Sequence, residues 1–166
     1  MTAQGVPGAT VGHGHLKVAD IDRAVAFYRD VIGMRLVLRY GRQAAFMSFD
    51  DYHHHLGLNT WESEGGSPPP PGHTGLYHVA FLFPDRASLG QVIDRIYQAG
   101  YSLTGAADHL VSEAVYLNDP DGNGLELYRD KPREVWPYDQ DGTLKMANAP
   151  LDVAALVAEG RAAAAG

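Results

Sequence analysis

The chain carries the same pattern of residues twice, and this internal repeat limits the folds that it can adopt. One apolar stretch begins at His13 and another at His78, 65 positions later. Asp20 and Asp85 follow their histidines at matching positions. Self-similarity at a fixed period is typical of folds built from copies of one supersecondary unit. The sequence therefore predicts two copies of a single module.

Each copy carries the signals of a strand followed by a helix. A short carboxylate can accept hydrogen bonds from the free N–H groups of a first helical turn, so Asp20 and Asp85 are predicted N-caps. Apolar residues after each aspartate recur at helical spacing. Gly33 and Gly100 suit the left-handed position that ends a helix. Each half thus begins with a strand, a capping aspartate, a helix and a glycine.

Three short strands are predicted after each helix. They cover residues 34–40, 44–49 and 53–60 in the first half, and 102–106, 113–117 and 124–129 in the second. The Asp-Pro-Asp-Gly run that ends at Gly122 predicts a tight hairpin turn between the last two strands. The predicted fold class is α+β, with two paired βαβββ modules.

We interpret residues 1–166 as one domain. The predicted divisions are a first module at residues 10–62, a proline- and glycine-rich linker at 63–73, a second module at 74–130 and a C-terminal tail at 131–166. Within the tail, a short helix is predicted at residues 151–159 with Asp152 near its start. Residues 162–166 are expected to fray.

Composition narrows the class of protein. The net charge is −7 at pH 7 without a cluster of Lys or Arg, which argues against a nucleic-acid partner. The absence of cysteine excludes disulfides, thiolate metal sites and cysteine nucleophiles. No apolar run approaches the roughly 18 residues of a membrane span, and the first residues lack a signal-peptide pattern. We therefore expect a cytoplasmic protein that binds neither nucleic acid nor membrane.

Two histidines and a glutamate form the candidate metal site. His13 and His78 match in the repeat, which favours His13 over His15 on the same strand face. Glu126 lies between apolar neighbours, where a carboxylate is costly unless it is paired or metal-bound. Two imidazoles and one carboxylate are the ligand set of many non-haem Fe(II) oxygenases. Taken singly, a strand histidine is more often a hydrogen-bonded core residue, and a lone strand glutamate usually faces solvent.

The run of three histidines from His53 to His55 is the other unusual feature. One interpretation is an edge strand with solvated imidazoles, and the other is that one of them faces the metal and moves protons. The sequence leaves open whether that residue is His54 or His55. Tyr116 and His109 lie near the strands of Glu126, where a phenol can donate a hydrogen bond to a substrate oxygen. Taken singly, each of these two is more often structural.

Several motifs resemble the vicinal-oxygen-chelate superfamily, which includes glyoxalase I, bleomycin- and fosfomycin-resistance proteins, methylmalonyl-CoA epimerases and extradiol dioxygenases. The motifs are His13-x-x-Leu-x-Val-x-Asp20, Ala26-Phe-Tyr28 and Val31-Ile-Gly33. The likeness covers about residues 10–130. It implies paired βαβββ modules that form a curved, cup-like mixed sheet.

Within this superfamily, residues 52–61, 75–80, 108–128 and 131–136 are similar to catechol 2,3-dioxygenases, the extradiol ring-cleavage proteins. The resemblance implies Fe(II) as the cofactor, with Mn, Zn, Ni or Co as alternatives. The residues that it implies are His13, His78 and Glu126 as metal ligands, His54 as the acid/base histidine, Tyr116 as a substrate-binding residue and His109 as a histidine beyond the ligands.

A missing carboxylate helps to choose among superfamily members. Glyoxalase-type sites commonly use a fourth ligand, a carboxylate in the last strand of the first module. The repeat offset places its counterpart at residues 58–61, and residues 53–61 contain no Asp or Glu. We therefore expect three ligands, with room for a chelating catecholate and O₂.

The favoured function is an Fe(II)-dependent extradiol ring-cleavage dioxygenase that acts on a catechol-type aromatic substrate with O₂. One alternative is a metal-dependent glyoxalase, epimerase or thiol transferase, and another is a non-catalytic protein that sequesters a drug or metabolite. Many extradiol enzymes carry four modules in one chain, whereas this sequence carries two. Because a two-module cup has exposed strand edges, we expect a homodimer, formed edge to edge or by exchange of modules.

Overall fold

Two four-stranded mixed sheets form the body of the protein in this computed structural model, which describes residues 5–166. The first sheet has the order β1 (Gly14–Lys17), β4 (Leu56–Asn59), β3 (Ala44–Ser48) and β2 (Arg35–Tyr40). The second has the order β5 (Val79–Leu82), β8 (Gly124–Asp130), β7 (Ser112–Asn118) and β6 (Gly105–Asp108). β1 pairs with β4, and β5 pairs with β8, in parallel. The other neighbouring strands are antiparallel. The predicted α+β fold of two βαβββ modules is confirmed.

The helices begin and end at the predicted signals. Asp20 accepts hydrogen bonds from two amides at the start of α1 (Ile21–Ala26), and Asp85 accepts one from Ser88 at the start of α2 (Arg86–Gln98). Gly33 and Gly100 have φ angles of 93° and 81°, the left-handed conformation that glycine adopts without strain.

The first helix departs from the continuous α-helix that the sequence predicts. After Ala26 it widens into a π-helix, η1 (Phe27–Ile32). The amides of Gly33 and Met34 both donate to the carbonyl of Tyr28, at 3.1 and 2.9 Å. The guanidinium of Arg95 in α2 donates to the carbonyls of Val31 and Ile32, so the second module satisfies groups that this helix end leaves free.

Strand boundaries also differ from the predictions, most of all near the histidine run. β4 begins at Leu56, so His53 and His54 belong to the connection from β3 and not to the predicted strand. A local turn explains this, since the side chain of Asp50 accepts a hydrogen bond from the amide of Tyr52. In the second module, β6 begins at Gly105 rather than at residue 102, because pairing with β7 starts opposite Tyr116.

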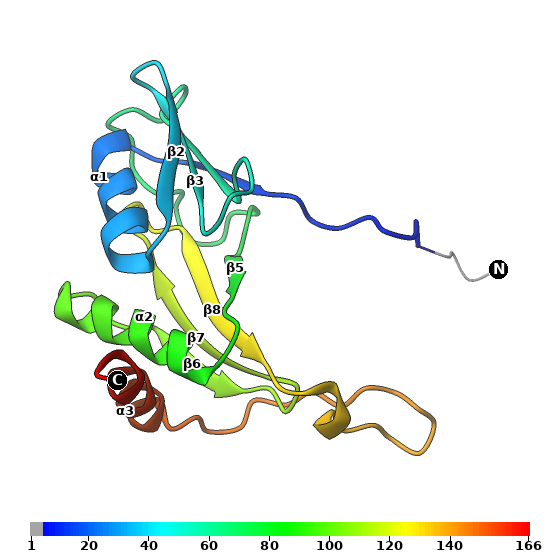
Figure 1. The fold of residues 1–166 in the computed structure, drawn as a ribbon. Coiled ribbons are helices and arrows are strands. Elements are labelled where there is room, and N and C mark those ends of the chain that lie inside the picture. Colours follow the sequence, from blue (N-terminus) through cyan, green and yellow to red (C-terminus); the bar gives the residue numbers. More distant parts are fainter. Residues whose placement is uncertain (1–4) are drawn as a thin grey trace.

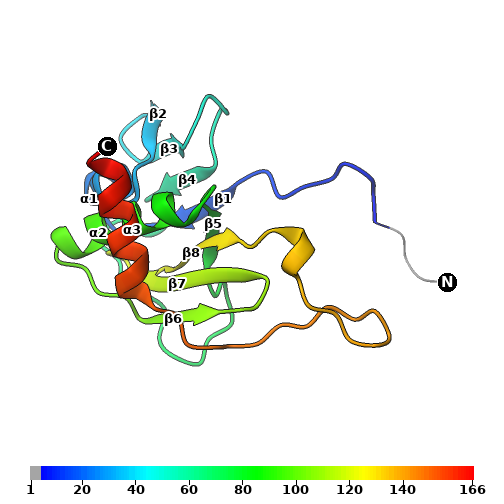
Figure 2. The ribbon, with the colours of Figure 1, turned by 60° about the horizontal axis from the view of Figure 1, so that its bottom comes forward.

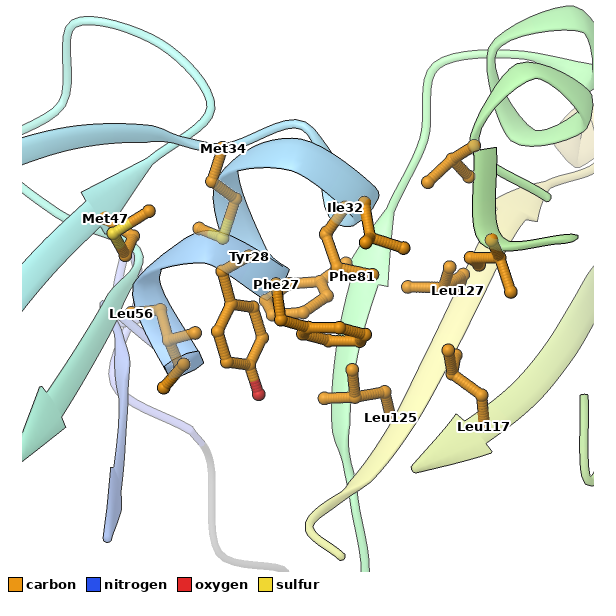
Figure 3. Packing of buried hydrophobic residues seen from close by; sticks show 14 of the residues in the cluster. Phe27, Tyr28, Ile32, Met34, Met47, Leu56, Phe81, Leu117, Leu125 and Leu127 are labelled. Atoms are coloured by element: carbon orange, nitrogen blue, oxygen red, sulfur yellow. The ribbon is translucent and has the colours of Figure 1, made fainter. Parts of the chain in front are cut away.

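The two modules pack against each other within this one chain. Figure 3 shows the side chains of Phe27 and Tyr28 from η1 between those of the first sheet and those of β5 and β8. The buried hydroxyl of Tyr28 donates to Asp119 at 2.9 Å, and Asp119 also closes the predicted hairpin turn through the amide of Gly122. The first strand of each module lies at this junction, where a Cβ on Gly14 would be 3.5 Å from Val79.

The helices cover one side of the sheets, as Figures 1 and 2 show. The last helix, α3 (Val153–Ala164), packs on α2 and has Asp152 at its start as predicted, where the Asp152 side chain accepts a hydrogen bond from the amide of Ala155. It continues to Ala164, so the expectation that fraying begins at residue 162 was wrong. The described residues 5–166 include no helix with the length and apolar character of a membrane span.

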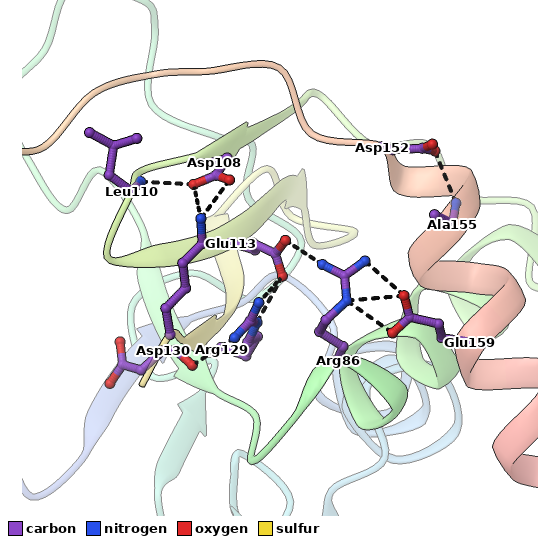
Figure 4. A network of polar contacts seen from close by, with 10 residues as sticks. Arg86, Asp108, Leu110, Glu113, Arg129, Asp130, Asp152, Ala155 and Glu159 are labelled. Atoms are coloured by element: carbon purple, nitrogen blue, oxygen red, sulfur yellow. Dashed lines mark hydrogen bonds and ion pairs between the residues drawn. The ribbon is translucent and has the colours of Figure 1, made fainter. Parts of the chain in front are cut away.

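Ion pairs through Arg86 connect α3 to the second sheet. Arg86 of α2 binds Glu159 of α3 and the buried Glu113 of β7, and Arg129 of β8 binds the second oxygen of Glu113 (Figure 4). Between β8 and α3, the chain passes through a 3₁₀ turn, η2 (Arg133–Val135), and returns along the edge of β6. This return brings residues 147–149 beside β6, where they reach the candidate site.

Candidate functional site

Glu126 and Tyr116 face each other on neighbouring strands. They form a directly opposed pair of β8 and β7, and Ala80 of β5 flanks Glu126 on its other side. The hydroxyl of Tyr116 donates to Oε1 of Glu126 at 2.9 Å. Glu126 therefore has a hydrogen-bond donor across the strand, as the cost of a partly buried carboxylate demands.

His78 approaches the same carboxylate from the start of β5. Its Nε2 lies 3.0 Å from Oε2 of Glu126, the oxygen that Tyr116 does not use. The other ring nitrogen, Nδ1, is buried and has no hydrogen-bond partner among the described protein atoms. His78 is thus directed at Glu126 through Nε2 alone.

His109 lies on the far side of Tyr116. Its Nε2 is 2.7 Å from the Tyr116 hydroxyl and 4.0 Å from Oε1 of Glu126. Its Nδ1 donates to the carbonyl of Ala147 at 3.1 Å, since a carbonyl can only accept. A continuous row of polar contacts therefore runs from Ala147 through His109, Tyr116 and Glu126 to His78.

The environment keeps Tyr116 protonated. Burial, together with the hydrogen bond to the Glu126 carboxylate, raises the pKa of Tyr116 to about 12. At neutral pH its hydroxyl is therefore a hydrogen-bond donor and not a phenolate.

A cavity of about 720 Å³ opens beside this row. His78, His109 and Tyr116 line it, together with Leu76 and Tyr77 from the segment before β5. Asn148, from the returning chain, also lines it. The volume lies within the range of small-molecule sites, about 300–1,000 Å³.

His13 and His54 meet at a second place. Their ring centroids are 4.3 Å apart, and the ring of His54 also packs on Phe46 of β3 at 4.8 Å. Nδ1 of His54 lies 2.7 Å from Nδ1 of His53. Burial, and next the charge of His13, lowers the pKa of His54, so its neutral form is favoured.

His55 points elsewhere. Its Nδ1 lies 3.0 Å from the hydroxyl of Ser48, and its ring packs on Phe49 and Tyr52. Of the two residues left open by the sequence, His54 is the one beside His13. His15 packs on Phe46 and Trp61.

The predicted site residues are therefore placed in two groups. His78, Glu126, Tyr116 and His109 are in one, and His13 and His54 are in the other. Within residues 5–166, no three His, Cys, Asp or Glu side chains converge as a ready metal-binding group.

The donor atoms of the first group are nonetheless suited to a divalent metal. Ligand nitrogens and oxygens lie about 2.0–2.2 Å from such an ion, so two adjacent ligands at right angles are about 3 Å apart. Nε2 of His78 and Oε2 of Glu126 have this separation, 3.0 Å. His13 is exposed and lies at the start of β1, so its side chain has the freedom to supply a third donor.

The strand register corrects one prediction. The matching cross-strand rows are His15–Gly57–Phe46 in the first sheet and Ala80–Glu126–Tyr116 in the second. The counterpart of Glu126 is therefore Gly57, and the expectation of residues 58–61 was wrong because the loops of the two modules differ in length. A Cβ at Gly57 would lie 2.8 Å from the ring of His15, so an imidazole covers the place of a fourth carboxylate.

Two contributors were missed by the sequence analysis. The carbonyl of Ala147 has no sequence signal, since any residue supplies one and only the return of the tail brings it near His109. The contact of His53 with His54 did have a signal, namely the adjacency of the two histidines in a turn-rich segment.

Comparisons with known proteins show the family to which the chain belongs. Residues 10–127 match the Glyoxalase/Bleomycin resistance protein/Dioxygenase superfamily. The chain belongs to this superfamily. Among curated superfamily relatives, a catechol-2,3-dioxygenase of Bacillus subtilis is 37% identical over 90% of this chain and 51% of its own length. Biphenyl-2,3-diol 1,2-dioxygenase 3 of Rhodococcus globerulus is 33% identical over 77% of this chain and 68% of its own length.

A solved superfamily structure has the same fold. The lactoylglutathione lyase of Agrobacterium tumefaciens superposes with a TM-score of 0.58 at 25% identity, and the match covers 75% of this chain and 96% of that one. Both dioxygenases and lyases thus occur among proteins similar to this chain. The chain spans about half the length of the Bacillus relative.

Proposed function

We propose that this protein is an Fe(II)-dependent extradiol ring-cleavage dioxygenase that acts on a catechol with O₂. The observation that carries the proposal is the row His78–Glu126–Tyr116–His109 beside a cavity of about 720 Å³. It combines potential metal donors with a protonated phenol at the wall of a small-molecule site. The identity of 37% to a protein named catechol-2,3-dioxygenase gives independent support.

In this proposal His13, His78 and Glu126 hold the metal. When bound there, Fe(II) would bind the catechol and mediate electron transfer between catechol and O₂. Gly57 offers no fourth protein ligand, which leaves positions open for a chelating substrate.

Tyr116 orients the substrate. Its hydroxyl is protonated and carries a single hydrogen, which here goes to Oε1 of Glu126, so it must turn from that oxygen to donate a hydrogen bond to a catechol oxygen that enters the cavity. His109 holds the phenol in place through its Nε2, and the carbonyl of Ala147 fixes the imidazole of His109. The positions of both groups are thus set before substrate arrives.

His54 moves protons. Its Nδ1 is engaged by His53, so Nε2 is the atom available to accept the catechol hydroxyl proton and to return it during ring opening. The packing of its ring on His13 and Phe46 holds that nitrogen close to one of the proposed metal ligands.

The test is anaerobic loading with Fe(II), followed by O₂ and a panel of catechols. We expect a yellow ring-fission product and consumption of one O₂ per catechol. Glu126→Gln removes the charge of a proposed ligand and should abolish the product, whereas Glu159→Gln is a matched control on the distant helix α3. Bound iron without product from any catechol contradicts the proposal.

A metal-dependent lyase is the second candidate, favoured by the superposition on a lactoylglutathione lyase. It predicts turnover of a glutathione hemithioacetal without O₂, with Ni, Co, Zn or Mn. The glycine at position 57 weighs against it, since no carboxylate occupies that point of the first sheet. Equal turnover with and without O₂ favours the lyase.

We also expect the protein to form a homodimer. The outer edge of β2 has no neighbouring strand within residues 5–166. Leu38 and Tyr40 on this strand are 54% and 68% exposed. An unpaired edge with apolar side chains is suited to association. Sedimentation equilibrium tests this expectation, and Leu38→Lys should shift the protein toward monomer.

A further inference from the structure

A tight turn between β6 and β7 sets the position of His109. This residue follows Asp108, the last residue of β6, and its amide donates to the carbonyl of Ser112 at 2.8 Å. The next residue, Leu110, has a φ angle of 72°, in the left-handed region that a residue with a side chain seldom adopts. Contacts from neighbouring groups must hold Leu110 in this conformation.

The side chain of Asp108 supplies such a contact. Its Oδ1 accepts a hydrogen bond from the amide of Leu110 at 2.8 Å, and both of its oxygens accept from Nζ of Lys131 at 2.6 Å. The side chains of Lys131 and Asp108 are only 20% and 23% exposed, so salt screens this ion pair less than a surface pair. Although burial acts to raise the pKa of Asp108, the hydrogen bonds from Lys131 and Leu110 lower it overall, so the carboxylate is charged at neutral pH.

The same ion pair joins the turn to the returning C-terminal chain. Lys131 comes directly after β8, at the start of that chain. Further along, the backbones of Asp108 and Ala149 exchange two hydrogen bonds of 2.9 Å. This pairing places the carbonyl of Ala147 at 3.1 Å from Nδ1 of His109. Asp108 therefore contacts both the turn that carries the imidazole and the chain that binds it.

We propose that Asp108 and Lys131 are positioning residues of the candidate site. Their ion pair keeps the turn and the returning chain together, so that His109 meets the hydroxyl of Tyr116 at 2.7 Å beside the cavity. Neither Asp108 nor Lys131 is among the described residues that line the cavity, so both act through His109. This inference rests on the proposed dioxygenase function, because it assigns to the pair an effect on catechol cleavage.

The first experiment follows His109 without metal or turnover. The metal-free full chain is labelled with ¹⁵N-histidine, and His109→Gln identifies the signal of its Nδ1–H. We expect slow exchange of this proton with solvent in the wild type, because it is bonded to the carbonyl of Ala147. Lys131→Met removes the ammonium and keeps a side chain of similar length. It should accelerate the exchange at least about tenfold, the effect of one lost hydrogen bond to a charged group.

Two further variants show whether the charge is the cause. Lys131→Arg keeps a cation that can bind both oxygens of Asp108, and should retain the wild-type exchange rate within about threefold. Lys145→Met is the matched control, because it removes an ion pair with Asp139, of 2.7 Å and about half exposed, in the same tail. It should leave the exchange of the His109 proton unchanged. An exchange rate that Lys131→Met does not alter overturns the inference.

Turnover of the Fe(II)-loaded protein separates positioning from a general loss of stability. We expect Lys131→Met to lower kcat/KM for a cleaved catechol by about tenfold at unchanged iron content. In a Tyr116→Phe background the same change should have almost no effect, because Lys131 acts through the hydroxyl that this variant lacks. An unchanged kcat/KM, or an equal loss in both backgrounds, overturns the inference.

The two proposals fail in different ways. If the wild type forms no ring-fission product, the dioxygenase proposal fails, and proton exchange still decides whether the ion pair holds His109. If product forms while Lys131→Met keeps the wild-type exchange rate and kcat/KM, the positioning role is wrong and the dioxygenase function stands. If Lys131→Met does not fold, Asp108→Asn replaces it with the same expectations, since its amide oxygen still accepts from Leu110 while the charge that binds Lys131 is lost.

Discussion

The hydroxyl of Tyr116 donates a hydrogen bond of 2.9 Å to Oε1 of Glu126, directly across β7 and β8. The same hydroxyl meets Nε2 of His109 at 2.7 Å. The phenol therefore lies between a proposed metal ligand and a histidine that the C-terminal tail holds. Through His109, the C-terminal tail therefore helps to position the hydroxyl that contacts a proposed metal ligand.

Replacement of Tyr116 by Phe tests the importance of this hydroxyl. We expect kcat/KM for a cleaved catechol to fall by about 10- to 100-fold, the effect of one lost hydrogen bond to a charged group. Bound iron should remain near the wild-type content, since no proposed ligand is removed. Steady-state oxygen consumption and metal analysis provide the two measurements.

Tyr97→Phe is the matched control for that change. Tyr97 lies on α2 and is 45% exposed, so its hydroxyl has no part in the proposed site. Unchanged kinetics in Tyr116→Phe, with Tyr97→Phe also unchanged, would remove Tyr116 from the proposed mechanism.

The histidines of the first strand can be separated by metal binding. We expect His13→Ala to lower the affinity for Fe(II) by at least about tenfold, because a ligand is removed outright, whereas loss of a ligand's outer partner already costs about 10- to 100-fold. His15→Ala should retain the metal, since His15 packs on Phe46 and Trp61. Competition with a chelator gives both affinities. A larger loss of Fe(II) affinity in His15→Ala than in His13→Ala would assign the ligand role to His15.

Much of the fold could be predicted from the sequence because its signals are local. The capping residues Asp20 and Asp85 and the glycines at 33 and 100 act through their own neighbours, and the structure has them where they were predicted. The register of β1 with β4 depends on contacts distant in sequence, such as that of His15 with Gly57. The repeat offset and the loop lengths do not determine this register, so the counterpart of Glu126 was expected at residues 58–61 instead of at Gly57.

Part of the candidate site could also be predicted from the sequence, and part could not. The repeat singled out His78 and the apolar context singled out Glu126, and these two do come together. The position of His109 depends on Ala147, which lies 38 residues further along the chain. No periodicity connects these two residues, and so the sequence could not predict the contact.

Acidification should weaken the attachment of α3 to α2. Hydrogen bonds from Arg161 lower the pKa of Asp94, and those from Arg86 lower the pKa of Glu159. A carboxyl with a lowered pKa in the folded state stabilises that state above its ordinary pKa and loses this effect as pH falls through the folded value. The protection factors of the α3 amides in hydrogen exchange should therefore fall below about pH 4.5, near the ordinary pKa values of these groups.

The double variant Asp94→Asn with Glu159→Gln is the control for this effect. It removes both titrating groups, so the protection factors of the α3 amides, which correct for the intrinsic pH dependence of exchange, should become nearly independent of pH in the same window. A pH dependence that persists in this variant would assign the weaker attachment to other carboxylates.

Close contact between two helices makes Gly160 sensitive to substitution. A Cβ there would lie 2.4 Å from the amide nitrogen of Gln91 and 2.5 Å from the carbonyl carbon of Gly90. Gly160→Ala gains up to about 1 kcal/mol of helix propensity, but the clash with backbone is expected to cost about 1–3 kcal/mol. We therefore expect a lower Tm. Ala163→Leu, at an exposed position of the same helix, should change it little.

The two adjacent histidines His54 and His55 should have separable effects. His54 lies beside His13, whereas His55 contacts the hydroxyl of Ser48. We expect His54→Asn to bind iron and catechol yet to lower kcat by about 100-fold or more, the usual effect of a lost proton-transfer group. His55→Asn should affect thermal stability more than kcat, because it disturbs a packing contact at the end of β3. A larger loss of kcat in His55→Asn than in His54→Asn would transfer the proton-moving role to His55.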